Sequence, residues 1–338
     1  MRTVQINAPY LLFLGDETRA TYVKTAQGLV DWVGDKCAGQ YRLTAQTTDL
    51  QLPDLSIAQA QELGVKSLLI GTAQIGGGIP DNWMPVLIEA LEKGLDIVAG
   101  LHTRLSSVPS LVASAKSSGA ILVDLRQPPN DIPIGNGRKR SGMRLLTVGT
   151  DCALGKKYTA LSLTKAMTEH GLNTTFRATG QTGMMIAGEG IAIDAVVTDF
   201  ISGAAELISP DNVASHWDVI EGQGAIFHPG YGSVSHGLLV GSQPDAFVVC
   251  SDATRTHISG WPDYPLPSIA DVIEHTIRIG QLTNPQIRCV GISVNTQALT
   301  GHERESFLAN LAAEHQLPCV DPLVTGCAPI IAEIERQF

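Results

Sequence analysis

Short apolar runs alternate with longer amphipathic segments along the first part of the chain. Apolar residues dominate the runs PYLLFLG (9–15), KSLLIGTA (66–73), GLDIVAGL (94–101) and GAILVDLR (119–126). The segments between them have helical spacing, as in Trp83, Val86, Leu87, Ala90 and Leu91. Continuous apolar strands separated by helices are typical of a parallel sheet covered on both faces. The pattern predicts an α/β fold whose N-terminal domain, residues 1–130, is doubly wound and Rossmann-like, although no GxGxxG motif opens a helix.

The same alternation resumes further along the chain and predicts a second α/β domain over residues 143–338. Strands are expected in RLLTVG (144–149), NTTFRATG (173–180), the start of IDAVVTDFISGAAEL (193–207), WDVIEG (217–222), AFVVC (246–250) and IRCVGISVN (287–295). Helices are expected at 269–279, at 303–313 and near the C-terminus. Between the domains, prolines, glycines and the basic cluster Arg138, Lys139 and Arg140 follow no periodicity. We therefore predict a linker at 131–142 with this cluster in a solvated hinge.

Composition narrows the classes of function. The 338 residues carry a net charge of −10, so no basic face for nucleic acid or an anionic membrane is expected. No segment approaches the length of a membrane span, which favours a cytoplasmic protein with a small-molecule substrate. The six cysteines form no CxxC pair and are expected to be reduced. Zinc-ligand spacing and a GxSxG motif are both absent from the sequence, which argues against a metallohydrolase or a serine hydrolase.

The stretch RLLTVGTDCALGKKYT (144–159) has the order strand, glycine-bearing loop, helix. Such a loop leaves backbone N–H groups unpaired at the positive end of a helix dipole, with Lys156 beside them. The stretch therefore predicts a cradle for a di- or triphosphate. The candidate binding residues are Gly149, Thr150, Asp151, Cys152, Ala153, Leu154, Gly155, Lys156, Lys157, Tyr158 and Thr159.

The loop departs twice from the usual phosphate-binding pattern. Five residues instead of four separate Gly149 from Gly155, and Lys157 stands where a Ser or Thr normally ligates Mg²⁺. GTDCALGKK resembles the GTDTxVGKT loop of dethiobiotin synthetase, in which the residue matching Asp151 helps hold the metal. The lysine indicates that protein cations neutralise the phosphates, and that the loop binds a nucleotide without cleaving it. We predict no metal ligands, and the sequence leaves open whether Mg²⁺ or ATP is ever bound.

Polar residues at the ends of other strands supply the candidate chemistry. Glu221 ends WDVIEG, in a segment similar to the EGxGG of dethiobiotin synthetase, and is a candidate general base or cation ligand. His228 is an alternative acid–base residue, and Asp199 is a second possible base. Candidate substrate ligands are His102, Arg104, Gln181, Thr182, Gln223 and Arg255; Arg255 could bind a carboxylate in bidentate fashion.

The motifs GTDCALGKK, ATGQTG, DFISGAAE, IEGQGAIFHPGYGS, SQPDAFVVC and AGLHTRL together resemble one family over nearly the full length of the chain. This is the DgcN-type D-glutamate N-acetyltransferase family, with an N-terminal doubly wound domain and a C-terminal P-loop domain. The resemblance implies transfer of an acetyl group from acetyl-CoA to the amino group of D-glutamate in D-glutamate catabolism. The phosphates of coenzyme A would then occupy the loop, with Glu221 or His228 as the base. We also expect a homo-oligomer.

Two other functions fit parts of the same pattern. An ATP-dependent ligase or kinase of the dethiobiotin synthetase type predicts ADP release that depends on substrate and Mg²⁺, and Lys157 argues against it. A non-catalytic, nucleotide-gated binding module predicts association without turnover, and the polar strand ends argue against it.

Overall fold

The computed structural model describes residue 4, residues 6–72 and residues 78–338. By their internal contacts, the residues divide into two compact units. The N-terminal unit comprises residues 2–128 together with 181–192, and the P-loop unit comprises residues 129–180 together with 193–338. The chain thus passes between the units three times. The domain boundaries expected at 130/131 and 142/143 stay predictions, and the expected strand end at Ala73 lies outside the described residues.

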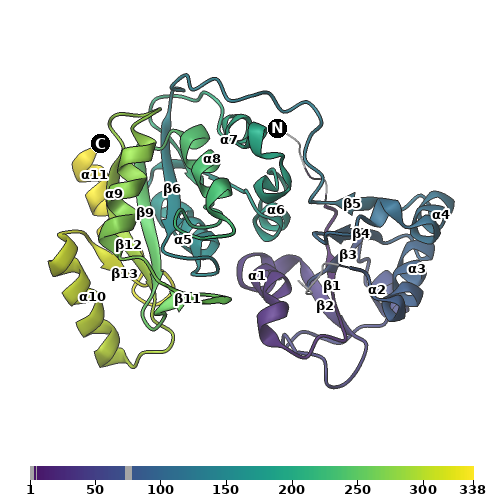
Figure 1. Ribbon diagram of the computed structural model, residues 1–338. Coiled ribbons are helices and arrows are strands. Elements are labelled where there is room, and N and C mark those ends of the chain that lie inside the picture. The colour runs from purple at the N-terminus through teal and green to yellow at the C-terminus, as the bar shows by residue number, and fades with distance from the viewer. Residues whose placement is uncertain (1–3, 5, 73–77) are drawn as a thin grey trace. The chain divides into compact units, whose positions relative to one another are not determined.

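The N-terminal unit contains a five-stranded parallel sheet in the order β2-β1-β3-β4-β5 (Figure 1). Four of these strands lie within the predicted apolar runs, and β2 was not predicted because its sequence, CAGQYR, is only half apolar. The strands are β1 (Tyr10–Gly15), β2 (Cys37–Arg42), β3 (Ser67–Ile70), β4 (Asp96–Ala99) and β5 (Leu122–Asp124).

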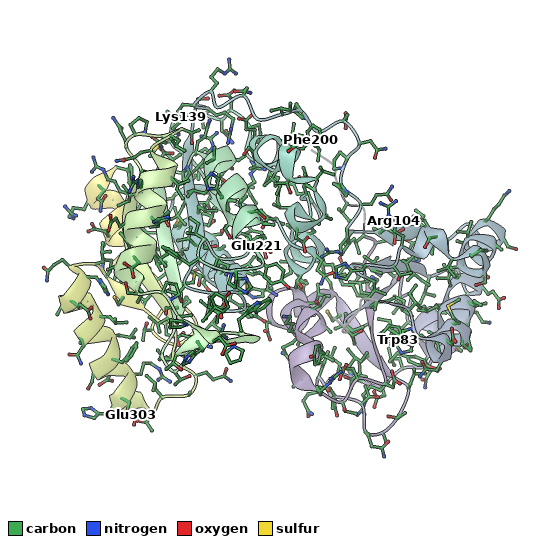
Figure 2. The ribbon with its side chains drawn as sticks, viewed as in Figure 1. Trp83, Arg104, Lys139, Phe200, Glu221 and Glu303 are labelled. Atoms are coloured by element: carbon green, nitrogen blue, oxygen red, sulfur yellow. The ribbon has the colours of Figure 1, made fainter. Side chains whose placement is uncertain are left out.

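Helices cover both faces of this sheet, as predicted for a doubly wound fold. In Figure 1, α2, α3 and α4 lie on one face and α1 lies on the other, where it packs against α6. Trp83 is fully buried in the core between the sheet and α3 and meets the ring of Phe13 edge-on at 5.1 Å (Figure 2). The helices are α1 (Lys24–Val33), α2 (Ile57–Glu62), α3 (Met84–Glu92), α4 (Pro109–Ser118) and α6 (Gln181–Ala187).

The P-loop unit contains a six-stranded parallel sheet in the order β13-β12-β9-β6-β8-β7. Five of the six predicted strands are confirmed, and the short β13 was not predicted. The strand expected in IDAVVTDFISGAAEL (193–207) is wrong, because this segment forms two 3-10 turns, Ile193–Ala195 and Thr198–Phe200, followed by α7 (Ile201–Ile208). Its buried residues Ile201, Ala204, Ala205 and Ile208 have the spacing of a helix face. Because β6 lies inside the sheet between β9 and β8, the loop that follows it emerges at the edge where parallel α/β sheets bind ligands. The strands are β6 (Met143–Gly149), β7 (Asn173–Arg177), β8 (His216–Ile220), β9 (Ala246–Asp252), β12 (Arg288–Asn295) and β13 (Cys319–Val320).

One apolar core joins α5 and α11 to this sheet, with Leu163, Val248 and Ile330 fully buried in it. Helices α7, α8 and α9 cover the other face, and the strands β10 (His257–Ile258) and β11 (Trp261–Pro265) form an antiparallel pair. The predicted helices at 269–279, at 303–313 and near the C-terminus are confirmed. The helices are α5 (Lys156–Glu169), α7 (Ile201–Ile208), α8 (Gly232–Ser242), α9 (Ile269–Gly280), α10 (Gly301–His315) and α11 (Ala328–Gln337).

The basic cluster before β6 differs from the solvated hinge that we predicted. Only Arg138 is solvated, with 79% of its side chain exposed. Lys139 pairs with Asp245 at 3.0 Å. Arg140 is buried, and its Nε donates to the carbonyl oxygen of Ser209 at 2.6 Å. The prediction was wrong because the partners of these cations lie some 70 to 106 residues away in sequence, where local patterning gives no sign of them.

The cysteine thiols are all free, as predicted, and Cys250, Cys289 and Cys327 are buried. Burial raises the pKa of Cys250 to about 11 and that of Cys289 to about 12, so both are protonated and unreactive at neutral pH. Across the described part of the chain, no helix has both the length and the apolar character needed to span a bilayer.

Candidate active site

The predicted phosphate loop joins β6 to α5 in the P-loop unit, so its eleven candidate residues form one continuous structure. Two residues in the left-handed region, Ala153 (φ 53°) and Gly155 (φ 98°), turn the chain into α5. Gly155 is the N-cap residue and no side chain caps the helix, so the positive end of the α5 dipole faces the loop. Lys156 is buried, and its Nζ donates to the carbonyl oxygen of Asp151 at 2.7 Å.

The electrostatics of the loop favour an anion. Burial lowers the pKa of Lys156, since a charged ammonium is costly to desolvate without a counter-ion. An arriving phosphate would supply that counter-ion. By contrast, the hydroxyl of Thr159 lies 2.8 Å from that of buried Ser293, so it is engaged inside the unit.

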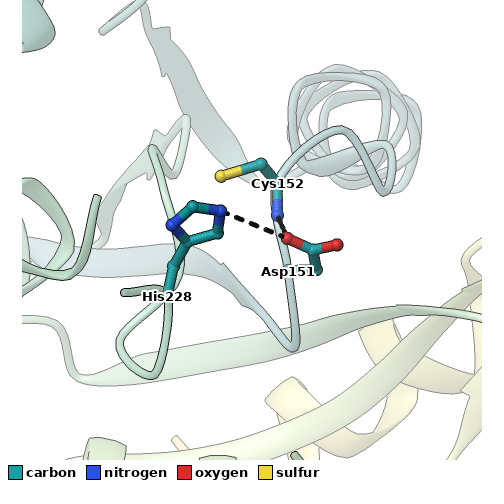
Figure 3. Close-up of side chains that lie close together, drawn as sticks. All are labelled: Asp151, Cys152 and His228. Carbon is teal, nitrogen blue, oxygen red and sulfur yellow. Dashed lines mark hydrogen bonds and ion pairs between the residues drawn. The ribbon is translucent and has the colours of Figure 1, made fainter. Parts of the chain in front are cut away.

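Asp151 is fully buried, and both of its carboxylate oxygens are engaged by protein donors. Oδ2 accepts hydrogen bonds from Nη1 of Arg255 and from the backbone N–H of Ser259, each at 2.8 Å. Oδ1 accepts from the backbone N–H of Cys152 at 2.6 Å (Figure 3). Arg255 also donates to the carbonyl oxygen of Cys152 at 2.7 Å. The structure therefore places Arg255, predicted as a carboxylate ligand, against the phosphate loop as its brace.

His228 points its ring at the same carboxylate (Figure 3), with Nε2 lying 3.9 Å from Oδ1 of Asp151. Nδ1 accepts hydrogen bonds from the backbone N–H groups of Gly230 and Tyr231, each at 3.1 Å. Burial lowers the pKa of His228, so the ring is neutral and its one proton sits on Nε2. Nε2, which has no partner among the described residues, is therefore a hydrogen-bond donor and cannot accept a proton.

Asp151, Cys152 and His228 each bring a potential metal-ligand atom within 4.8 Å of the others. A metal on Nε2 of His228 would require the proton on Nδ1, which faces two N–H donors. The carboxylate is already paired with Arg255. The donor set therefore fits a metal ion poorly.

Glu221 follows β8 directly and is the second buried carboxylate of the P-loop unit (Figure 2). Its Oε2 accepts hydrogen bonds from the backbone N–H groups of Thr179 and Gly180, each at 3.0 Å. Burial raises the pKa of Glu221, and these two hydrogen bonds and the charge of Lys157 only partly offset the rise. A carboxylate with a raised pKa is a competent proton acceptor, so Glu221 suits the role of base better than His228 does.

The segment after Glu221 requires glycine. The N–H of Gly222 donates to the hydroxyl of Thr147 at 2.9 Å, and a Cβ at this position would lie 1.7 Å from the carbonyl oxygen of Thr147. The side chain of Gln223 donates to the hydroxyl of Thr179 at 3.0 Å. The sequence predicted Glu221 and Gln223 as site residues but not Thr147 and Thr179. Thr147 lies inside a strand, and Thr179 lies in the motif ATGQTG, from which only Gln181 and Thr182 were selected.

The other candidates are one exposed turn residue and four residues of the N-terminal unit. Asp199 is exposed in a short 3-10 turn, Thr198–Phe200. Four predicted substrate ligands belong to the N-terminal unit: His102, Arg104, Gln181 and Thr182. His102 and Arg104 are exposed. Gln181 packs on Gly100, where an added Cβ would lie 1.7 Å from its Oε1.

The motif ATGQTG is divided between the two units. Thr179 and Gly180 hold Glu221, whereas Gln181 and Thr182 begin α6 in the N-terminal unit, where Thr182 donates to the hydroxyl of Thr25 at 3.1 Å. The sequence predicted one polar strand end here and gave no sign of this division.

The fold and the loop define this protein as a P-loop α/β protein. Its loop is followed by Lys156 and Lys157 at the start of α5, with a lysine where the Mg²⁺-ligating hydroxyl normally stands. A buried carboxylate, Glu221, lies at the end of the neighbouring strand β8. Family models support a narrower identification. Residues 133–331 match the P-loop domain, and residues 35–128 the Rossmann-like N-terminal domain, of a family described as DUF1611, a domain of unknown function. The chain belongs to this family, and the predicted fold class is confirmed.

Individual relatives cover nearly the whole chain. A D-glutamate N-acetyltransferase of Pseudoalteromonas sp. is 46% identical over 98% of this chain and 100% of its own length. A D-glutamate N-acetyltransferase of Tritonibacter scottomollicae is 44% identical over 96% of this chain and 98% of its own length. A crystal structure of a DUF1611 family protein from Anabaena variabilis superposes with a TM-score of 0.88 at 32% identity, over 98% of this chain and 100% of that one. The resemblance inferred from the motifs is thereby confirmed.

Proposed function

We propose that this protein is an N-acetyltransferase that moves an acetyl group from acetyl-CoA to the amino group of D-glutamate. Two relatives that are 44% and 46% identical over nearly their full length carry that name. The structural observation that carries the proposal is that both carboxylate oxygens of Asp151 are hydrogen-bonded to the protein. The carboxylate that would help a related ATP-cleaving loop hold its metal is saturated by Arg255, Ser259 and Cys152.

Phosphoryl transfer needs a well-held Mg²⁺, and the loop lacks both the hydroxyl and a free carboxylate for it. Lys156, Lys157 and the N–H groups at the start of α5 instead offer positive charge to a phosphate that is bound and not cleaved. Coenzyme A carries such phosphates in its diphosphate and 3′-phosphate groups. We assign Gly155, Lys156, Lys157 and the neighbouring loop to these groups.

Glu221 supplies the base in this account. The ammonium of D-glutamate must lose a proton before its nitrogen attacks the thioester carbonyl, and a buried carboxylate of raised pKa can take it. The developing oxyanion needs hydrogen-bond donors, and we assign this role to the backbone N–H groups after Gly222. His228 contributes a donor at Nε2. The exposed Arg104 and His102 are our candidates for the two carboxylates of D-glutamate, since Arg255 is engaged by the loop.

With the phosphates of coenzyme A in the loop, the path of its pantetheine arm to Glu221 is constrained. The charge of Lys157 acts on Glu221, so the phosphate cradle and the base lie in one neighbourhood. The thioester of coenzyme A is separated from its diphosphate by the whole pantetheine arm. The arm must therefore fold back on itself to bring the acetyl group to Glu221.

We also place the reaction in the cytoplasm, where free thiols such as those of this chain stay reduced.

The proposal is tested by mixing the purified protein with acetyl-CoA and D-glutamate and measuring free coenzyme A with a thiol reagent. Thiol release that needs D-glutamate, matched by formation of N-acetyl-D-glutamate, is the expected result. L-Glutamate and a reaction without an amino acid are the controls. Absence of thiol across a range of pH, together with Mg²⁺-dependent consumption of ATP, would favour the ligase or kinase alternative and overturn the proposal.

A further inference from the structure

A small cavity lies in the P-loop unit beside the segment that follows Glu221. Its volume is about 20 Å³, and the end of β6, residues 222–226, α8 and α9 enclose it. A cavity needs roughly 10–15 Å³ to hold a single water, so this one admits a guest only slightly larger. The apolar residues that line it are Leu146, Val148, Ala225, Ile226, Leu238, Leu239 and Val272.

Polar residues also line the cavity: Thr147, Gln223, Ser235 and Thr276. The hydroxyls of Thr147 and Ser235 are hydrogen-bonded within the unit. Thr276 lines the cavity from α9, is fully buried, and its hydroxyl has no partner among the described residues. The backbone N–H groups of Gln223, Gly224 and Ala225 likewise have no acceptor within the described part of the chain. Gly224 adopts a φ of 63°, a conformation that lets successive N–H groups converge on one point. Thr276 and Ala225 are buried, whereas Gln223 and Gly224 are half-buried. A buried polar group without a partner is costly, so the Thr276 hydroxyl and the Ala225 N–H indicate a guest with an acceptor atom.

We propose that this cavity receives the acyl group of the thioester and restricts the enzyme to acetyl. The inference rests on the proposed function and adds its specificity. No charged side chain lines the cavity, so the charged groups of D-glutamate would be costly to bury there. The acetyl group has one methyl for the apolar wall and one carbonyl oxygen for the donors.

The transfer step balances around this placement. The ammonium of D-glutamate first loses one proton to Glu221, and the neutral nitrogen then forms a bond to the acetyl carbon. The N–H groups of Gln223, Gly224 and Ala225 stabilise the negative oxygen of the tetrahedral intermediate. The carbon–sulfur bond then breaks, and the second proton of the nitrogen passes to the leaving thiolate, which gives the amide and free coenzyme A; Glu221 releases its proton to solvent.

The test is the acyl-chain specificity of variants that enlarge the cavity. Leu238→Ala removes three heavy atoms from the wall, and Val272→Ala is a second enlargement should the first variant fold poorly. We measure kcat/KM with acetyl-, propionyl- and butyryl-CoA. An added methylene in an apolar pocket is worth about 1–3 kcal/mol, so the propionyl-to-acetyl ratio should rise about tenfold or more. Leu163→Ala is the matched control, because Leu163 is fully buried on α5 in the core on the other face of the sheet.

An unchanged ratio in properly folded Leu238→Ala and Val272→Ala proteins, with only a parallel loss of all three activities, would overturn the acyl-pocket assignment. The wild-type reaction separates this failure from failure of the proposed function. Wild-type release of thiol from acetyl-CoA keeps the transferase function standing, whereas no release from any of the three thioesters would overturn both.

Discussion

Nη1 of Arg255 lies 2.8 Å from Oδ2 of Asp151, and this ion pair stabilises the phosphate loop with a protein cation in place of a metal ion. Asp151 is fully buried, whereas 22% of the Arg255 side chain is exposed. The guanidinium also reaches the backbone carbonyl of Cys152, so one side chain supports the loop at two points. The loop can therefore keep its shape without a metal ion.

Arg255→Ala should destabilise the protein and weaken binding of acetyl-CoA. Removing one partner of a buried ion pair leaves an unpaired charge and costs about 3 kcal/mol. We expect a lower melting temperature and a rise of about tenfold in the KM for acetyl-CoA. Adding Asp151→Asn should recover part of the stability. Arg288→Ala, at an exposed position of β12, is the control. Equal stability of Arg255→Ala and Arg288→Ala would contradict the bracing role.

Metal removal should leave the reaction unchanged. Because Asp151 is paired and Lys157 replaces the hydroxyl ligand, no step of the account uses Mg²⁺. We expect kcat and KM to be the same with excess EDTA as with added Mg²⁺. A loss of activity in EDTA that Mg²⁺ restores would show that the anion cradle depends on a metal.

Lys156→Ala should raise the KM for acetyl-CoA far more than the KM for D-glutamate. A hydrogen bond to a charged group contributes about 1.5–3 kcal/mol, which corresponds to roughly a 10- to 100-fold change in affinity. Steady-state kinetics with each substrate varied in turn measure the two effects. Lys165→Ala removes a lysine from the same helix at an exposed position and should change neither KM. Similar rises for both substrates would place the phosphates elsewhere.

Glu221→Gln should lower kcat by about 10²- to 10⁴-fold, the usual contribution of a general base. Burial raises the pKa of Glu221, so the wild-type rate should increase with pH through a value above that of an ordinary glutamate. The folded-state pKa exceeds the unfolded one, so ionised Glu221 disfavours folding above that pKa. The glutamine variant should thus be at least as stable as wild type at neutral pH. If the rate of the glutamine variant still rose with pH over the same range as that of the wild type, Glu221 would be excluded as the titrating base.

His228 should be neutral at neutral pH, with its proton on Nε2. Nitrogen-15 NMR of labelled protein reports the tautomer directly, and His228→Gln identifies the signal by its disappearance. Burial lowers the pKa of His228 in the folded protein below the ordinary value of 6.5. As pH falls below 6.5, this histidine therefore takes up a proton more readily in the unfolded chain than in the folded protein. The free energy of unfolding should decrease over the same pH range. A proton found on Nδ1 would restore His228 as a candidate base.

The sequence predicted those features that depend on local patterning. The order strand, loop, helix from Arg144 to Thr159 predicted the cradle, and continuous apolar runs predicted strands of both sheets. The place of Glu221 at a strand end followed from the same pattern. Each of these features is written in neighbouring residues, so a single sequence is enough to find it.

Features that depend on distant partners were not predictable. Arg255 reaches a carboxylate 104 residues away, and Arg140 is buried against a carbonyl group 69 residues away. The sequence showed the charges but not their partners, so it suggested a substrate ligand and a solvated hinge. The burial of His228 beside Asp151, 77 residues away in the sequence (228 − 151), has the same origin.

A crystal structure of the protein with coenzyme A bound tests the central claim most directly. The account predicts that the diphosphate or the 3′-phosphate lies within hydrogen-bonding distance of Lys156 or Lys157 and of the N–H groups at the start of α5, with no metal between them. A bound coenzyme A whose diphosphate and 3′-phosphate both lie far from these two lysines would contradict it.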